Sequence, residues 1–256
     1  MGELLTLNHV SYSYHSLEGE TPALHDVSFQ VPEGEFLAIV GPSGCGKSTL
    51  LSLIAGLAPP SAGTIEINGR RPCDRELHIG YMLQKDHLLE WRTTFRNLSL
   101  GLEINKQDTP ENLARIDELL DAYGLAPFRN AKPSALSGGM RQRAALIRTL
   151  VLRPDILLLD EPFSALDYQT RLTVSDDIWQ IIRKEQKTAI LITHDISEAV
   201  SMGDRVIVLT RRPGTVRTIV DIRLAADKRS PLKARSDPHF KDYFNLIWKE
   251  LTDCEL

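Results

Sequence analysis

Residues 41–49 read Gly41-Pro42-Ser43-Gly44-Cys45-Gly46-Lys47-Ser48-Thr49, which matches the phosphate-binding loop pattern G-x-x-x-x-G-K-S/T. The glycines let backbone N–H groups turn toward an anion, and the start of a following helix adds a positive field. Lys47 supplies a mobile charge for the β- and γ-phosphates, and the Ser48 hydroxyl can bind magnesium. An ordinary glycine-rich turn is the alternative, but the complete pattern predicts a site for a nucleoside triphosphate.

The segments on both sides of this loop fit its required context. Residues 36–40 are all apolar, which is typical of a strand that is buried on both faces. Residues 50–55 predict a helix, and Gly56 is placed as a C-cap glycine. The sequence therefore predicts the strand, loop and helix arrangement that this pattern needs in order to bind phosphates.

The composition is that of an ordinary globular chain. The 256 residues are 42% hydrophobic and 25% charged, and the formal net charge is −4. This charge gives no case for nucleic-acid binding. No apolar stretch reaches the ~18 residues of a membrane span, and the start of the chain does not resemble a signal peptide. Cys45, Cys73 and Cys254 lack metal-ligand spacing, which favours a reducing cytoplasm.

Residues 3–40 alternate apolar and polar side chains and predict antiparallel strands that lead to the loop strand. Tyr12 and Tyr14 lie just before a polar loop. Either ring could stack on a nucleobase, or both could be ordinary strand residues. Two more strands are predicted at 63–67 and 79–83.

Residues 94–152 carry no strong strand signal and predict a helical insertion. Within it, residues 111–123 place their apolar side chains on one helical face. Thr109 is a plausible N-cap, Pro110 fits the first helical position and Gly124 fits the C-cap.

Polar side chains follow the predicted strands of an α/β sheet. Gln84 follows the strand at 79–83, Asp160-Glu161 follows 156–159, and His194 follows 189–192 with one residue between. Because ligands bind beyond the carboxyl ends of such strands, we expect these side chains to meet the phosphate loop. Asp160 and Gln84 can hold magnesium, Glu161 can accept a proton from water, and His194 can contact a γ-phosphate.

A second anion-binding helix start is predicted at Leu136-Ser137-Gly138-Gly139-Met140. Ser137 is a suitable N-cap, the two glycines leave the backbone bare, and a helix is expected over 140–152. A simple capped helix is the alternative.

In this order along the chain, these motifs resemble the nucleotide-binding subunit of an ATP-binding cassette (ABC) transporter. The resemblance covers nearly the whole chain and rests on six segments: 41–49, Gln84, 136–143, 156–162, 164–167 and His194. It implies an α/β fold: a RecA-like P-loop core sheet with an N-terminal antiparallel β region and a helical insertion. The ATPase domain is expected at 3–225, with the insertion at about 94–152, and a linker and an amphipathic helix at 226–256. Within the last segment, the charges and prolines of residues 227–238 predict a solvated linker.

The resemblance also implies the site. Two copies of the chain would bind two ATP molecules, each between the Gly41 loop of one copy and Ser137 to Gly139 of the other. The implied cofactor-binding residues are Tyr14, Gly41, Pro42, Ser43, Gly44, Cys45, Gly46, Lys47, Ser48, Thr49, Ser137, Gly138, Gly139 and Asp167. Tyr14 would stack on adenine and Asp167 would cross the interface. The implied catalytic residues are Glu161, His194, Gln84 and Lys47, and the implied Mg²⁺ ligands are Ser48, Gln84 and Asp160.

A narrower resemblance is to importers of nitrate, sulfonate and taurine, or of a thiamine-pyrimidine precursor. It rests on residues 88–91, Asn97, 101–103 and 212–214. The family commonly has proline where this chain has Glu90. The implied partners are transmembrane permease subunits and, indirectly, an extracytoplasmic solute-binding protein, with no nucleic acid. The implied location is peripheral, on the cytoplasmic face of the membrane.

Two other functions are compatible with an ATP-binding cassette. A soluble cassette protein of translation or DNA repair usually carries two cassettes or a long coiled coil, and no sustained heptads occur here. A nucleotide-dependent assembly protein that hydrolyses poorly is disfavoured by Glu161.

Three further expectations concern apolar or reactive side chains. Leu88, Leu89 and Trp91 either fill the core of the insertion or anchor a membrane subunit. Cys45 is either a reactive thiolate beside Lys47, protected by ATP, or a small residue chosen for fit. The helix predicted at 239–251 is expected to pack its apolar face on the body of the protein, and a groove of a partner is the alternative.

Overall fold

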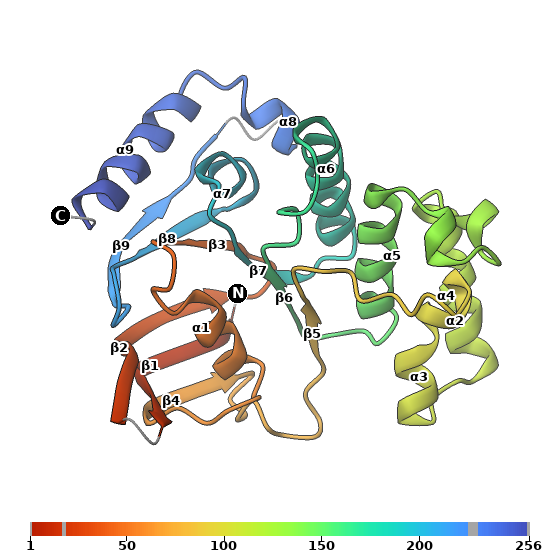
Figure 1. The fold of residues 1–256 in the computed structure, drawn as a ribbon, viewed down its shortest axis with the longest axis horizontal. Coiled ribbons are helices and arrows are strands. Elements are labelled where there is room, and N and C mark those ends of the chain that lie inside the picture. Colours follow the sequence, from red (N-terminus) through yellow and green to blue (C-terminus); the bar gives the residue numbers. More distant parts are fainter. Residues whose placement is uncertain (1, 17–18, 225–229, 255–256) are drawn as a thin grey trace.

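The computed structural model describes residues 2–16, 19–224 and 230–254, which form two sheets with helices layered around them (Figure 1). The antiparallel sheet has the order β2-β1-β4 and consists of β1 (Glu3–Ser16), β2 (Gly19–Pro32) and β4 (Ala62–Ile67). The second sheet has six strands in the order β5 (Ile79–Met82), β6 (Ile156–Asp160), β7 (Thr188–Ile192), β3 (Phe36–Val40), β8 (Arg205–Leu209) and β9 (Val216–Asp221). Its strands are parallel except β9, which pairs antiparallel with β8. The α/β architecture with an antiparallel N-terminal region is as predicted.

The helix α1 (Lys47–Ile54) lies between the two sheets (Figure 1). Leu37 and Ile39 of β3 pack in the same apolar cluster as Leu50 of α1, whereas Phe36 and Ala38 belong to clusters on the other side of the sheet. Alternate side chains of a strand point to opposite faces, so β3 is apolar throughout because both of its faces are covered. Burying one such side chain stabilises the fold by about 1.5–3 kcal/mol.

The far face of the large sheet packs against helices that include α6 (Tyr168–Lys184), α7 (Ile196–Met202) and α9 (Phe240–Asp253) (Figure 1). In α9, Ile247 is fully buried and Phe244 packs against the same cluster. The predicted packing of this helix on the body is confirmed, but Trp248 is 59% exposed and only stacks on Phe244.

The helical insertion lies beyond the β5 side of the large sheet (Figure 1). It consists of α2 (Thr94–Leu98), α3 (Leu100–Asn105), α4 (Pro110–Ala122), α5 (Gly138–Leu150) and two short 3₁₀ turns, η1 (Ala126–Phe128) and η2 (Pro133–Ala135). The Thr109 hydroxyl caps α4 by accepting from the Asn112 N–H at 3.3 Å, and Gly124 follows the helix at φ 70°. One face of α5 packs in the core of the insertion and another packs against the sheet. The helix α5 therefore connects the helical insertion to the large sheet.

The linker predicted at 227–238 is partly wrong. Residues 227–229 lie outside the described residues, but Pro231–Ala234 form a short helix, α8. Pro231 and Ala234 are buried, and the Leu232 N–H donates to Asp176 Oδ1 at 3.0 Å. The prolines and charges suggested a solvated segment because the sequence does not reveal this contact with α6. Within the described residues, no helix combines the length and the apolar character needed to cross a membrane.

Candidate nucleotide site

The phosphate-binding loop connects β3 to α1, and β3 lies between β7 and β8 in the sheet. Gly44 and Gly46 have φ values of 74° and 107°, a region that favours glycine. A Cβ atom at Gly46 would also lie 2.8 Å from the Ala23 carbonyl oxygen. The Lys47 ammonium donates to the carbonyl oxygens of Gly41 and Pro42 at 2.7 and 3.0 Å. The loop and its lysine thus form a compact, positively charged cradle at the start of α1.

This cradle opens into a cavity of about 510 Å³ that collects side chains from distant parts of the chain. Its lining residues are Tyr14, Ala23, Ser43, Gly44, Gly46, Lys47, Ser48, Thr49, Glu161, His194 and Arg212. The expected convergence of Lys47, Glu161 and His194 at the carboxyl edge of the sheet is therefore present. Ala23 and Arg212 were not predicted as site residues. Arg212 lies beyond the carboxyl end of β8, and this position was the sequence signal that could have identified it.

A second group of atoms beside the loop fits a magnesium ion. The Ser48 hydroxyl donates to Asp160 Oδ1 at 3.2 Å. Burial raises the pKa of Asp160, and the nearby charge of Glu161 also raises it, although the bond from Ser48 opposes them. A cation would relieve this cost, and hydroxyl and carboxylate oxygens are ligands that Mg²⁺ prefers. Ser48 and Asp160 therefore fit the ion that the family implies.

Tyr81 is a neighbour of this group that the sequence analysis missed. Its hydroxyl donates to the other carboxylate oxygen of Asp160 at 3.4 Å. Burial and the adjacent Asp160 raise the pKa of Tyr81 to about 12, so the phenol stays protonated. Because Tyr81 lies on β5 and Asp160 ends the adjacent β6, strand pairing was the signal that could have identified it.

Glu161 and His194 face each other across the ends of β6 and β7. His194 Nδ1 lies 3.2 Å from Glu161 Oε2, and the Glu161 N–H donates to the Ile192 carbonyl at 2.9 Å. Glu161 has φ 45°, a conformation that is strained for a residue with a side chain. The strand pairing holds this turn, so the carboxylate points into the cavity next to the imidazole.

Gln84 lies beside this turn and does not line the cavity. Its amide donates to the Ser164 hydroxyl at 3.1 Å, and Ser164 in turn donates to the Glu161 carbonyl at 3.0 Å. The predicted side chain is therefore connected to the carboxylate turn through Ser164. It contacts neither Ser48 nor Asp160 in any hydrogen bond of the described residues.

The two tyrosines before the polar loop take different positions. Tyr14 is 46% exposed and lines the cavity, where its hydroxyl lies 2.8 Å from the Thr49 hydroxyl. Tyr12 packs against the core cluster between the sheets. Their rings meet edge to face with centroids 5.0 Å apart. The Tyr14 ring is thus placed where it can stack on a bound base, and Tyr12 packs against it edge to face.

Cys45 is buried, which disfavours the reactive thiolate, one of the two alternatives for this residue. It is 1% exposed, and burial raises the pKa of its thiol more than the nearby Lys47 lowers it. The thiolate alternative is therefore disfavoured, because the thiol points into the core cluster. The alternative, a small residue chosen for fit, agrees with this burial.

The second predicted anion site is separate from the first. The Ser137 hydroxyl accepts from the Met140 N–H at 3.3 Å, which caps α5 as predicted. Ser137, Gly138, Gly139 and Asp167 line a different cavity of about 530 Å³. Among the described residues, none lines both cavities. One chain therefore does not bring Ser137 to Gly139 onto the phosphate loop.

The link that joins the sheet to the insertion is tied to α5 by two arginines. Arg141 pairs with Asp86 at 2.9 Å and with Glu90 at 2.8 Å. Arg148 donates to the backbone carbonyls of Asp86 and His87 at 2.7 and 2.8 Å. Burial of Asp86 acts against its charge, but the bonds from Arg141 and from the Leu88 N–H outweigh it, so its pKa is lowered. Glu90, where the family commonly has proline, is therefore part of this link.

The apolar side chains of the same link separate into two kinds. Leu88 is buried in the core of the insertion, whereas Trp91 is 74% exposed. Leu83, just before Gln84, is also exposed. Of the two alternatives for these side chains, filling the core of the insertion explains Leu88 but not Trp91.

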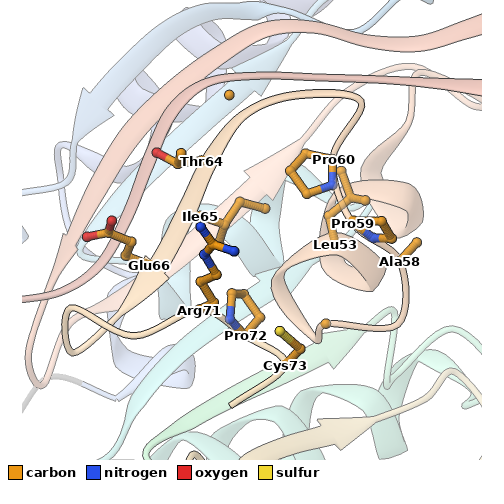
Figure 2. A pocket seen from close by; sticks show the side chains of 12 residues that line it. Leu53, Ala58, Pro59, Pro60, Thr64, Ile65, Glu66, Arg71, Pro72 and Cys73 are labelled. Carbon is orange, nitrogen blue, oxygen red and sulfur yellow. The ribbon is translucent and has the colours of Figure 1, made fainter.

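Another cavity, of about 420 Å³, lies at the opposite end of α1 from the phosphate loop (Figure 2). Figure 2 shows the Arg71 side chain beside Ile65 and Pro72, with Pro59 and Pro60 farther from it. It contains none of the predicted site residues. The geometry that suits a triphosphate is confined to the other end of the helix.

Comparisons with known proteins agree with this geometry. A protein-family model described as "ABC transporter" matches residues 24–164. An uncharacterized ABC transporter ATP-binding protein of Bacillus subtilis is 46% identical over 98% of this chain and 96% of its own length. A nitrate import ATP-binding protein of Synechocystis is 39% identical over 96% of this chain and 92% of its own length. A taurine import ATP-binding protein of Pelagibacter ubique is 38% identical over 88% and 85%, respectively.

A solved structure gives the same result. It is a dimeric ATP-binding cassette in a post-hydrolysis state, bound to ADP and Pi, with a TM-score of 0.72 and 32% identity. The match covers 86% of this chain and 99% of that one. The chain therefore belongs to the ABC transporter family and is one of its ATP-binding, ATP-hydrolysing subunits.

Proposed function

We propose that this chain is the ATPase of an importer, and that two copies couple Mg-ATP binding and hydrolysis at their shared interface to import through separate permease subunits. The observation that carries the proposal is the separation of the two anion-binding helix starts, each incomplete, in one chain. In a dimer with two-fold symmetry, the start of α5 of each copy would face the phosphate loop of the other copy. The related cassette of known structure is dimeric.

In the proposed complex, the loop from Gly41 to Thr49 binds the β- and γ-phosphates through its N–H groups and Lys47. Tyr14 stacks on adenine. Ser137 to Gly139 of the second copy contact the γ-phosphate, and Asp167 lies at the interface. The 3.2 Å bond from Ser48 to Asp160 supports these two residues as Mg²⁺ ligands, with Gln84 joining when nucleotide binds. When bound, Mg²⁺ neutralises phosphate charge.

The proposed chemistry is attack of water on the γ-phosphorus. The Glu161 carboxylate accepts a proton from this water while the bond from the γ-phosphorus to the ADP oxygen breaks. His194, 3.2 Å from Glu161, orients the carboxylate and can donate to a γ-phosphate oxygen. A positioned base of this kind contributes a factor of about 10²–10⁴ in rate.

The test is Glu161→Gln, which keeps the size of the side chain and removes the base. We expect ATP binding to persist and hydrolysis to fall about 10²–10⁴-fold. Glu66→Gln is the matched control, because this exposed carboxylate lines the cavity at the other end of α1. Near-normal hydrolysis by Glu161→Gln would contradict the assignment of Glu161 as the general base.

The partner surface is proposed around Trp91, with exposed Leu83 beside Gln84. A short cytoplasmic helix of a permease would dock there, so that the chain lies peripherally on the cytoplasmic face of the membrane. The nitrate and taurine import proteins among its relatives support a nitrate- or taurine-like solute, delivered by an extracytoplasmic binding protein. A sulfonate and a thiamine-pyrimidine precursor are the alternatives that the motif resemblance implies. We assign the ATPase unit to 3–225 and the C-terminal segment to 226–256.

Two other functions predict different results in co-purification and ATPase experiments. A soluble cassette protein of translation or DNA repair would not co-purify with a permease. A nucleotide-dependent assembly protein would bind ATP and hydrolyse it poorly, which the Glu161→Gln assay detects in the wild-type reference.

A further inference from the structure

The turn between β8 and β9 is built directly onto the phosphate loop. The Gly214 N–H donates to the Ala23 carbonyl at 2.9 Å, and the Gly214 carbonyl accepts from the His25 N–H at 3.0 Å. A Cβ atom at Gly214 would lie 2.2 Å from the Cys45 carbonyl oxygen. Only glycine allows this approach, so the turn is fixed in place against both β2 and the loop.

This turn places the Arg212 side chain at the cavity. Its Nε donates to the Pro22 carbonyl at 2.9 Å, and its side chain lines the cavity together with Tyr14 and Lys47. In residues 2–16, 19–224 and 230–254, no carboxylate forms an ion pair with Arg212. One N–H is therefore used as an anchor, and the terminal nitrogens keep their charge and donors for another group.

The hydrogen bond from Arg212 to the Pro22 carbonyl places Arg212 at the end of the cavity near Tyr14. In the β1–β2 ribbon, Ser13 pairs with Pro22 and Tyr14 pairs with Thr21. The anchor of Arg212 is thus one register position from the ring that can stack on a base. The phosphate end already has Lys47 and the start of α1. A planar guanidinium suits the face of an aromatic ring better than a lysine ammonium does.

We propose that Arg212 is a nucleotide-binding residue that contacts the base of ATP, opposite or beside Tyr14. This inference rests on the proposed placement of the nucleotide in the cavity. The guanidinium would stack on the purine, so that the base is held by one ring and one planar cation. The contact would add affinity and leave the positions of the reacting phosphates unchanged.

The experiment measures dissociation constants of the purified subunit for the Mg²⁺ complexes of AMP-PNP and of inorganic tripolyphosphate, which lacks a base. We expect Arg212→Ala to weaken AMP-PNP binding about 3- to 30-fold, because cation–π contacts have this strength. Binding of tripolyphosphate should not change. Arg211→Ala is the matched control: it removes the same charge from the neighbouring exposed residue, which does not line the cavity, and should stay within about twofold.

Substitution by lysine separates a stacking contact from a simple charge. Arg212→Lys should remain weak for AMP-PNP, since it restores the charge without the planar group. Equal AMP-PNP affinities of Arg212→Ala and Arg211→Ala would overturn the inference, and so would a loss of tripolyphosphate affinity or full rescue by lysine. Arg212→Gln, which keeps an N–H donor for Pro22, serves if the alanine variant does not fold. Failure of the wild-type chain to bind AMP-PNP would count against the proposed function instead.

Discussion

The starts of α1 and α5 are alike in sequence and different in their surroundings. Glycines precede α1 and form the first two residues of α5, and each helix start opens into its own cavity. Around the start of α1 are Lys47, Glu161 and His194, whose charged and hydrogen-bonding groups suit a triphosphate. The cavity at α5 contains Arg143, which pairs with Asp177 at 3.6 Å, and the carboxylate of Asp167. The cavity at the start of α1 therefore contains predicted catalytic residues, whereas in the described part of the chain none of them lines the cavity at the start of α5.

The largest expected effect separates the roles of the two helix starts. Lys47→Ala should weaken Mg-ATP binding by the isolated monomer about 10- to 100-fold, because it removes a charged donor to the phosphates. Ser137→Arg should keep the monomer affinity within about threefold but abolish hydrolysis, because it blocks the second start. Titration at protein concentrations below dimerisation measures the affinities. An equal loss of affinity in both variants would place the two starts at one site within one chain.

A smaller effect tests the link between the sheet and the helical insertion. Arg141, in the first turn of that helix, is bound to Asp86 and Glu90, so the link that carries Trp91 is tied to α5 and not to α1. Trp91→Ala should leave the ATPase of the isolated subunit largely intact and weaken assembly with the permease about 30-fold, the size of a hot-spot loss. Co-purification and transport assays measure this.

Ile104→Ala is the matched control for Trp91→Ala, because Ile104 is another exposed apolar residue of the insertion, at 72% exposure. It should leave assembly unchanged. If Trp91→Ala instead lowers the melting temperature without a separate effect on assembly, Trp91 belongs to the core of the insertion.

The parts of this fold that local sequence signals specify were predicted correctly. The apolar run before Gly41, the cap at Thr109 and the cap at Ser137 each depend on neighbouring residues, and each lies where it was expected. The meeting of Lys47, Glu161 and His194 also followed, because it needs only the parallel order of strands.

What the sequence did not reveal depends on contacts between distant segments. Arg212 reaches Pro22 across 190 positions, and Tyr81 reaches Asp160 across 79. The packing of Pro231–Ala234 against Asp176 turned an expected linker into a helix. The choice between the two alternatives for Cys45 depends on its burial among residues of distant segments, which raises the pKa of the thiol against the effect of Lys47.

The central claim, that each site is shared between two copies, is tested most directly by mixing two inactive chains. A dimer of one Lys47→Ala chain and one Ser137→Arg chain has one doubly damaged site and one undamaged site if the sites are shared. After subunit exchange at equal concentrations, the account predicts that ATPase activity returns to about a quarter of wild type, because half of the dimers are mixed and each has one intact site. If both parents and the exchanged mixture stay inactive, or if Ser137→Arg alone hydrolyses ATP normally, the shared site is contradicted.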